Sequence, residues 1–140
     1  QVRDLWIRPA LVLGPRTTLS DTAAALRARD VSAAVVGHAG APIAVVTERD
    51  LTRAVADGTG PHAAVGELAT DDPVTVAPTT TVLDAATTML RTGVRHLVVA
   101  ERRRVVGIVS MRDLLAALVT ASTTPHEVHP TRFAVERRQP

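Results

Sequence analysis

An internal repeat constrains this chain more than any other feature. The stretch VVTERDLTRAV at 45–55 returns as IVSMRDLLAAL at 108–118, a shift of 63 positions (108 minus 45). The same shift aligns Pro15 with Pro78 and continues between these points without a gap. Two copies at a period of about 60 residues indicate a duplicated, pseudo-symmetric pair and not a solenoid array. The chain therefore has to fold as two similar halves.

Each copy carries the same order of hydrophobic patterns. A short apolar run near prolines predicts a strand, apolar residues at helical spacing predict a helix, two apolar runs around a polar turn predict a hairpin, and a second helical stripe follows. The predicted fold class is α/β, or α+β, with two tandem β-α-β-β-α repeats. The expected strands cover 10–13, 33–36, 43–46, 74–76, 97–100 and 105–109, and the expected helices start at Ser20, Glu48, Thr80 or Thr81, and Met111.

The repeat also divides the chain into parts. We expect residues 1–60 to form the first repeat, 61–122 the second, and 123–140, rich in Thr, Pro, His and Arg, a flexible tail. Matching segments at 2–5 and 65–68 precede the first strand of each copy and predict a short docked helical turn. The two halves are joined through the glycine- and proline-containing segment 57–62.

Composition excludes several function classes. The chain of 140 residues has no cysteine, so disulfides and thiolate chemistry are excluded, and its only aromatic residues, Trp6 and Phe133, cannot build a stacking platform for bases. Its basic residues are all arginine, with a formal net charge of only +2. No apolar run has the length of a membrane span, so we expect a cytoplasmic protein that does not enter a membrane.

A hydroxyl residue stands three positions before an aspartate at each strand-to-helix junction. Thr47 and Ser110 fall where the first amides of a helix are unpaired, which suits an anion, and Asp50 and Asp113 can accept hydrogen bonds from vicinal hydroxyls such as those of a ribose. The same pattern is typical of a capping box that needs no ligand. For either copy alone, capping is the stronger interpretation.

The strand before each junction holds a small residue. Gly107, in mid-strand, costs stability and often marks close approach of another group to the backbone, and its counterpart Ala44 is also small. This observation favours a ligand-binding interpretation of both junctions.

Together with these junctions, DPVTVAPTTTVLDAATTML at 72–90 and GVRHLVVA at 93–100 carry a family resemblance. From about residue 2 to residue 118 the chain resembles the paired cystathionine-β-synthase-type domains, called CBS-domain pairs or Bateman modules. The resemblance implies pseudo-twofold packing and two clefts for an adenosine-containing ligand, which would be AMP, ADP, ATP or S-adenosylmethionine. It implies a sensing protein that needs no cofactor and signals to an effector protein not identified by the sequence.

The resemblance also implies which residues form the clefts. Asp50 and Asp113 would hold ribose hydroxyls, and Thr47 and Ser110 would contact phosphate or ribose. The other implied nucleotide-binding residues are Val74, Thr75 and Val94 at the Asp50 cleft, Leu11, Val12 and Val31 at the Asp113 cleft, Arg49 and Arg112 before the aspartates, and Ala44, Val45, Gly107 and Ile108 in the preceding strands.

The two copies differ at one basic pair. Arg95 and His96 stand where such families often carry a phosphate-binding pair, whereas the first copy has Ser32 and Ala33. We therefore expect the Asp50 cleft to bind nucleotide more tightly. The alternatives are a solvated Arg95 and a partly buried, hydrogen-bonded His96, with Arg49 and Arg112 in surface ion pairs.

Other functions are weaker predictions. The run Arg102-Arg103-Arg104 suits nucleic-acid phosphates but has no recognition helix or aromatic partner, so weak nucleic-acid binding through the arginines stays an alternative function. HEVH at 126–129 lacks further metal ligands, so no metal site is expected. No nucleophile stands beside a base, which argues against an enzyme.

Assembly is the remaining expectation. The second helices carry Leu51, Val55, Leu114, Leu115 and Leu118, which is more apolar surface than two small repeats need internally. We expect a homodimer through a helical face. The alternative to a sensor is a ligand-free dimerisation or docking scaffold.

Overall fold

The computed structural model describes residues 1–5, 9–38, 41–102 and 104–122, so the expected tail lies outside the described residues. It confirms the predicted fold class and the order of elements in both repeats. In chain order these are η1 (Val2–Asp4), β1 (Val12–Leu13), α1 (Leu19–Arg29), β2 (Ala33–His38), β3 (Ala41–Thr47), α2 (Glu48–Ala56), η2 (Val65–Glu67), β4 (Thr70–Asp71), β5 (Thr75–Val76), α3 (Val82–Thr92), β6 (His96–Glu101), β7 (Arg104–Ser110) and α4 (Met111–Ser122), where η is a 3-10 turn.

Threonine hydroxyls begin the first helix of each repeat. Thr18 accepts a hydrogen bond from the Asp21 amide at 3.0 Å, and Thr81 accepts one from the Asp84 amide at 3.0 Å. Thr81 was one of the two predicted caps, but the predicted cap Ser20 is wrong. Ser20 lies inside the first turn of α1, whereas Thr18 has the extended backbone that an N-cap needs.

Each repeat folds around a small mixed sheet. The first sheet has the order β1-β2-β3-β4, and the second has the order β5-β6-β7. In both, the short first strand pairs in parallel with the strand after the helix, and the hairpin that follows is antiparallel. The hairpin ends at Thr47 or Ser110, so each sheet delivers the chain directly to the start of α2 or α4.

Alternate strand residues face different surroundings. In the first repeat, Val36 and Val46 pack with Leu26 in one hydrophobic core, which also contains Ala34 and Val65. In the second repeat, Val99 and Val109 pack with Met89 in the other core, which also contains Leu97 and Val2. Because neighbouring strand residues point to opposite faces, Val35 and Val98 point away from these cores, yet they are only 2% and 1% exposed. The opposite faces of the two sheets therefore bury each other.

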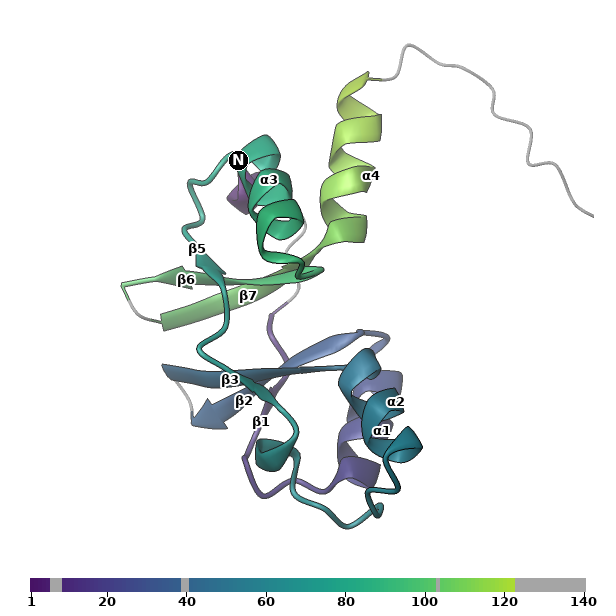
Figure 1. Cartoon of the computed structure of the whole chain (residues 1–140). Coiled ribbons are helices and arrows are strands. Elements are labelled where there is room, and N and C mark those ends of the chain that lie inside the picture. Colours follow the sequence, from purple (N-terminus) through teal and green to yellow (C-terminus); the bar gives the residue numbers. More distant parts are fainter. Residues whose placement is uncertain (6–8, 39–40, 103, 123–140) are drawn as a thin grey trace, which may run out of the picture.

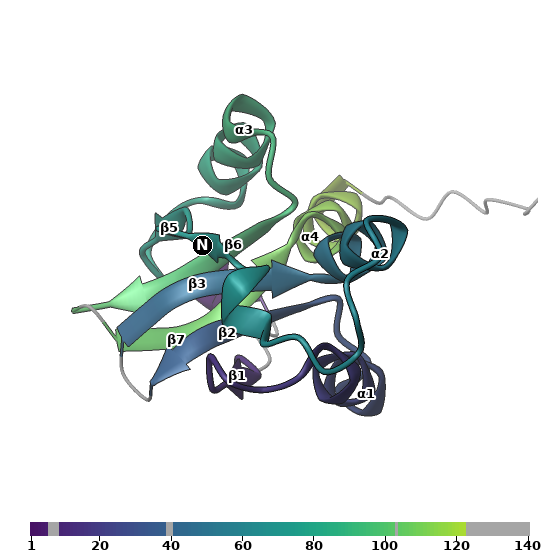
Figure 2. The same cartoon turned by 60° about the horizontal axis from the view of Figure 1, so that its bottom comes forward.

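The sheets lie between the helices of the two repeats. Figure 1 shows α1 and α2 at one end of the molecule, α3 and α4 at the other, and the strands between them. Strands β3 and β7 contact each other, and Figure 2 shows them overlapping in that view. This arrangement places the starts of α2 and α4 beside the seam between the repeats.

The helical turns are exchanged between the repeats. Val2 of η1 belongs to the core of the second repeat, and Val65 of η2 belongs to the core of the first. The Val2 amide donates to the Thr80 carbonyl at 2.8 Å, and the Val65 amide donates to the Thr17 carbonyl at 2.8 Å. Strand β4 also pairs with β3. Each packed unit therefore contains a helical turn from the other side of the boundary expected between residues 60 and 61.

We predict that Gly66 is required for this exchange. Its amide donates to the Pro15 carbonyl at 2.9 Å, and an added Cβ would lie 2.9 Å from that same backbone oxygen. Gly66→Ala should lower the free energy of unfolding by about 1–3 kcal/mol, as other overpacked sites do, when measured by urea denaturation. Gly60→Ala is the matched control, because a Cβ at Gly60 meets nothing within 4 Å. Equal stability of the two variants would contradict the prediction.

Candidate functional site

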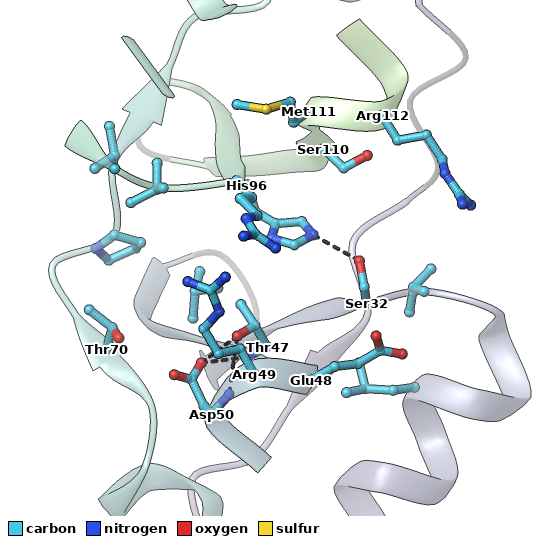
Figure 3. Close-up of a pocket in the computed structure, with 18 of the residues that line it drawn as sticks. Ser32, Thr47, Glu48, Arg49, Asp50, Thr70, His96, Ser110, Met111 and Arg112 are labelled. Carbon is cyan, nitrogen blue, oxygen red and sulfur yellow. Dashed lines mark hydrogen bonds between the residues drawn. The ribbon is translucent and has the colours of Figure 1, made fainter. Parts of the chain in front are cut away.

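Two cavities lie at the seam between the repeats. The larger has a volume of about 750 Å³ and is bordered by the starts of α2 and α4, the end of α1, and the segments around 70–74 and 93–96. The smaller has a volume of about 210 Å³ and includes Leu11, Ile108 and Asp113. Figure 3 shows the wall of the larger cavity, with Thr47 to Asp50 on one side and Ser110 to Arg112 on the other.

The repeated hydroxyl-to-aspartate motif forms the same hydrogen bonds in both repeats. The Thr47 amide and hydroxyl donate to Asp50 Oδ2 at 2.8 and 2.7 Å, and the Asp50 amide returns a longer bond of 3.4 Å to the Thr47 hydroxyl. The corresponding distances between Ser110 and Asp113 are 2.7, 2.6 and 3.2 Å. Both motifs are reciprocal capping boxes, as the capping interpretation predicts.

The capping box limits what each member can offer a ligand. The Thr47 and Ser110 hydroxyl protons are already donated to the aspartates, so a phosphate contact through them would require breaking a short hydrogen bond. All capping bonds that the two carboxylates accept go to Oδ2, which leaves Oδ1 as an acceptor outside the box. The aspartates can thus cap a helix and accept from a ligand at once.

The structure brings most of the predicted residues to the two cavities. Eleven of them line the larger one: Val31, Val45, Thr47, Arg49, Asp50, Val74, Val94, Arg95, His96, Ser110 and Arg112. The smaller cavity is lined by Leu11, Val31, His96, Ile108, Ser110, Arg112 and Asp113. Asp50 and Arg95 share the larger cavity, which is the pairing that the sequence predicts for the tighter site.

Four predicted residues line neither cavity. Ala44 is 3% exposed and packs in the core of the first repeat, and Gly107 is buried opposite Val99 of the second core. Strand alternation explains this correction, since Val45 and Ile108, one position along, are the residues that face the cavities. Val12 and Thr75 occupy corresponding positions of the two repeats, and both side chains are exposed. The preceding residues line the cavities instead, Leu11 the smaller one and Val74 the larger one.

Sequence reasoning missed several polar residues of the walls. Asp30 and Ser32 line both cavities, and the larger cavity also includes, among others, Arg27, Glu48, Thr70, Asp72 and Met111. The repeat itself held a signal for two of them, because the 63-residue shift places Asp30 on Gly93 and Ser32 on Arg95. The remaining residues come from loops and helix ends whose position depends on packing.

His96 joins the two repeats. Its Nε2 lies 2.8 Å from the Ser32 hydroxyl, a hydrogen bond between residues 64 positions apart that Figure 3 shows across the seam. Burial lowers the pKa of His96 below its usual value of 6.5, although the carboxylates of Asp113 and Glu48 oppose that effect. His96 is therefore the partly buried, hydrogen-bonded histidine of the alternative interpretation, and it is neutral at pH 7 instead of adding charge beside Arg95.

The structure also places some of the residues behind the weaker predictions. Arg102 and Arg104 are exposed in the second hairpin, while Arg103 and the HEVH segment lie outside the described residues. Among the residues described, no group of three or more acidic, histidine or cysteine side chains could hold a metal ion. None of the described helices has the length and hydropathy required to cross a bilayer.

The lowered pKa of His96 predicts a pH-dependent stability. The unfolded chain takes up a proton as the pH falls through 6.5 and the folded chain does so only at lower pH, so stability should be highest above 6.5 and decline below it. His96→Gln should lose less stability than the wild type between pH 7.5 and 5.5 in urea denaturation. His62→Gln, at an exposed position, is the control and should keep the wild-type dependence. Parallel curves for wild type and His96→Gln would contradict this assignment.

Comparison with known proteins agrees with this architecture. The model of the CBS domain matches residues 2–57 and 65–120. Uncharacterized protein MJ1225 of Methanocaldococcus jannaschii is 27% identical over 118 residues, which is 84% of this chain but only 42% of that protein's length.

Two solved structures extend the comparison to ligands. The CBS domain protein PAE2072 of Pyrobaculum aerophilum, complexed with AMP, is 33% identical with a TM-score of 0.77, covering 86% of this chain and 98% of that one. CBSX2 in complex with AMP is 25% identical with a TM-score of 0.72, covering 87% and 98%. With both repeats matched by the family model and the same fold in these structures, this chain belongs to the CBS-domain family as a tandem pair.

Proposed function

We propose that this CBS-domain pair is a regulatory module that binds an adenosine-containing ligand in the larger cavity. AMP, ADP, ATP and S-adenosylmethionine are the candidates, and AMP is the ligand of the similar PAE2072 structure. The observation that carries the proposal is the Asp50 capping box at the wall of a 750 Å³ cavity, a volume within the range of about 300–1,000 Å³ typical of ligand sites.

Asp50 supplies the ribose contact in this proposal. Its Oδ2 is fixed by the Thr47 amide and hydroxyl, so the carboxylate cannot rotate freely, and its Oδ1 can accept hydrogen bonds from ribose hydroxyls. A preoriented acceptor loses little entropy on binding. The helix cap thus prepares the ligand contact.

Arginines supply the phosphate contact. Arg95 and Arg49 line the larger cavity from opposite repeats, and a guanidinium can bind a phosphate through two parallel hydrogen bonds. Apolar walls for the base come from Val31, Val74 and Val94, which are half-buried. Both repeats therefore contribute to one ligand.

Regulation follows from that shared wall. A ligand in the larger cavity contacts the start of α2 in one repeat and the 93–96 segment and the start of α4 in the other. If the repeats can take two relative placements, the ligand shifts their equilibrium toward the placement that it binds more tightly. The size of that shift is limited by the difference between the ligand's affinities for the two placements. An effector protein or a fused domain would respond to that placement.

Asp50→Asn should weaken AMP binding while preserving the helix cap. An asparagine oxygen can still accept from the Thr47 amide, but its NH₂ group cannot accept from a ribose hydroxyl. We expect the Kd for AMP in calorimetric titration to rise by roughly 10-fold to 100-fold. This change corresponds to the loss of one hydrogen bond to a charged group, which contributes about 1.5–3 kcal/mol.

Asp113→Asn is the matched control, because it makes the same change in the other capping box, outside the larger cavity. It should change AMP affinity less than twofold. AMP, ATP and S-adenosylmethionine all failing to bind the folded wild type would refute the sensor, and equal effects of the two substitutions would refute the ribose contact.

A dimerisation scaffold is the second candidate, and it is favoured by the exposed helix faces of the second repeat. Leu83 and Leu90 on α3 are 67% and 75% exposed, and Leu115 on the neighbouring α4 is 60% exposed. Leu51 and Leu114, which the sequence assigned to the same surface, are instead core residues at 9% and 1% exposure. Exposed apolar side chains in such number are typical of an interaction surface.

We expect these leucines to hold a homodimer. The double substitution Leu83→Glu and Leu115→Glu should convert a dimer to a monomer in sedimentation velocity, because it places charges in an apolar contact. Their counterparts 63 positions earlier, Ser20 and Thr52, are also exposed, so Ser20→Glu with Thr52→Glu is the control and should leave the dimer intact. A wild-type chain that stays monomeric at high concentration would contradict the expectation.

A further inference from the structure

The two cavities occupy equivalent places, but their charged residues differ. The larger cavity is lined by four arginines and four carboxylates, namely Arg27, Arg49, Arg95 and Arg112 against Asp30, Glu48, Asp50 and Asp72. The smaller is lined by one arginine, Arg112, against Asp30 and Asp113. The first wall is charge-balanced, and the second has an excess of negative charge.

The internal repeat shows how this difference arises. Position 95 of the second repeat corresponds to 32 of the first, so Arg95 beside the Asp50 box is matched by Ser32 at the other cavity. Position 93 corresponds to 30, so Gly93 is matched by Asp30. Both are left-handed helix C-caps, with φ of 71° and 51°. These two exchanges remove a cation and add an anion, while a third, Pro9 in place of Asp72, removes one carboxylate, so the smaller cavity keeps a net excess of one negative charge.

The Ser32 hydroxyl is also engaged. Its hydrogen bond of 2.8 Å to His96 stands in the wall that both cavities share, so a ligand phosphate in the smaller cavity would have to displace it to reach that hydroxyl. The volume of about 210 Å³, against about 750 Å³ in the larger cavity, also leaves less room for a phosphate beside a nucleoside. Space and polar partners are therefore both limited where a phosphate would lie.

The features of a nucleoside site remain in the smaller cavity. Asp113 has the same capping box as Asp50, with Oδ1 outside it, and Leu11, Val31 and Ile108 provide apolar contact. A sugar diol and a base can be held by these groups without any cation. A phosphate would instead face two carboxylates and one arginine, and like charges at short range are unfavourable.

We propose that the smaller cavity binds a phosphate-free nucleoside, uncharged or cationic, while the larger cavity binds the phosphorylated nucleotide. This inference rests on the proposed function and extends it, because one CBS-domain pair would then respond to two chemically different ligands. Because Asp30, Ser32 and His96 line both cavities, the two ligands would share a wall.

Calorimetric titration with AMP and adenosine tests the proposal. Wild-type protein should bind one AMP, with an affinity that Asp50→Asn weakens and Asp113→Asn leaves unchanged. Protein saturated with AMP should still bind one adenosine, and Asp113→Asn should weaken that second event at least 10-fold. Two AMP molecules bound with similar affinity, or no adenosine binding to the AMP-saturated protein, would overturn the inference.

An exchange of residues between the repeats gives a stricter test. Asp30→Gly with Ser32→Arg gives the smaller cavity the residues of the second repeat, and glycine suits the left-handed backbone at position 30. This variant should bind a second AMP, and a stoichiometry that stays at one in a folded variant counts against the inference. If thermal unfolding shows that the double variant is poorly folded, the single substitution Asp30→Asn replaces it. Asparagine tolerates the left-handed backbone at position 30, and its loss of the negative charge should still raise the affinity of the smaller cavity for AMP.

The outcomes separate this inference from the proposed function. Binding of one AMP sensitive to Asp50→Asn, without any adenosine site, keeps the sensor and removes the second ligand. Absence of binding by AMP and adenosine alike removes both.

Discussion

The exchange of helical turns between the repeats is the contact on which the rest of the structure depends. Val2 completes the core of the second repeat and Val65 completes the core of the first, each fixed by amide hydrogen bonds to the opposite segment. Each repeat alone would lack a buried residue and expose the inner face of its sheet. The exchange therefore keeps the sheets face to face and creates the seam in which both cavities lie.

The capping boxes place the carboxylates of Asp50 and Asp113 at the seam without destabilising the fold. An aspartate at the third helical position stabilises its helix whether or not a ligand is present, because it accepts from the N-cap backbone and opposes the helix dipole. Its second oxygen remains available to the cavity. Capping and ligand binding, which compete as explanations of the sequence motif, are compatible in the structure because they use different oxygen atoms of one carboxylate.

Departures from symmetry distinguish the two halves. The Ser32–His96 bond has no equivalent across the pseudo-twofold relation, because the corresponding residues are Arg95 and Ala33. One seam position therefore holds a hydrogen-bonded pair, and the other places the Arg95 guanidinium in the wall of the larger cavity. The exposed leucines of α3 and α4 show the same asymmetry, since Ser20 and Thr52 replace Leu83 and Leu115 in the first repeat. The two halves thus share one backbone arrangement and differ in the side chains at these positions.

The sequence by itself determined the repeat, the order of elements, the helical turns and both capping boxes, because each depends on hydrogen bonds and hydrophobic periodicity within a few neighbouring residues. It also identified Asp50, Arg95 and their apolar neighbours as members of one cavity through the repeat and the family resemblance. Only the tertiary structure decided that Ala44 and Gly107 face the cores, that His96 is tied to Ser32, and that Asp30 stands between the cavities. The last two features arise where segments about 60 residues apart pack together, which leaves no local pattern in the chain. The first depends on which face of each strand meets its own helices, and alternation alone does not say which face that is.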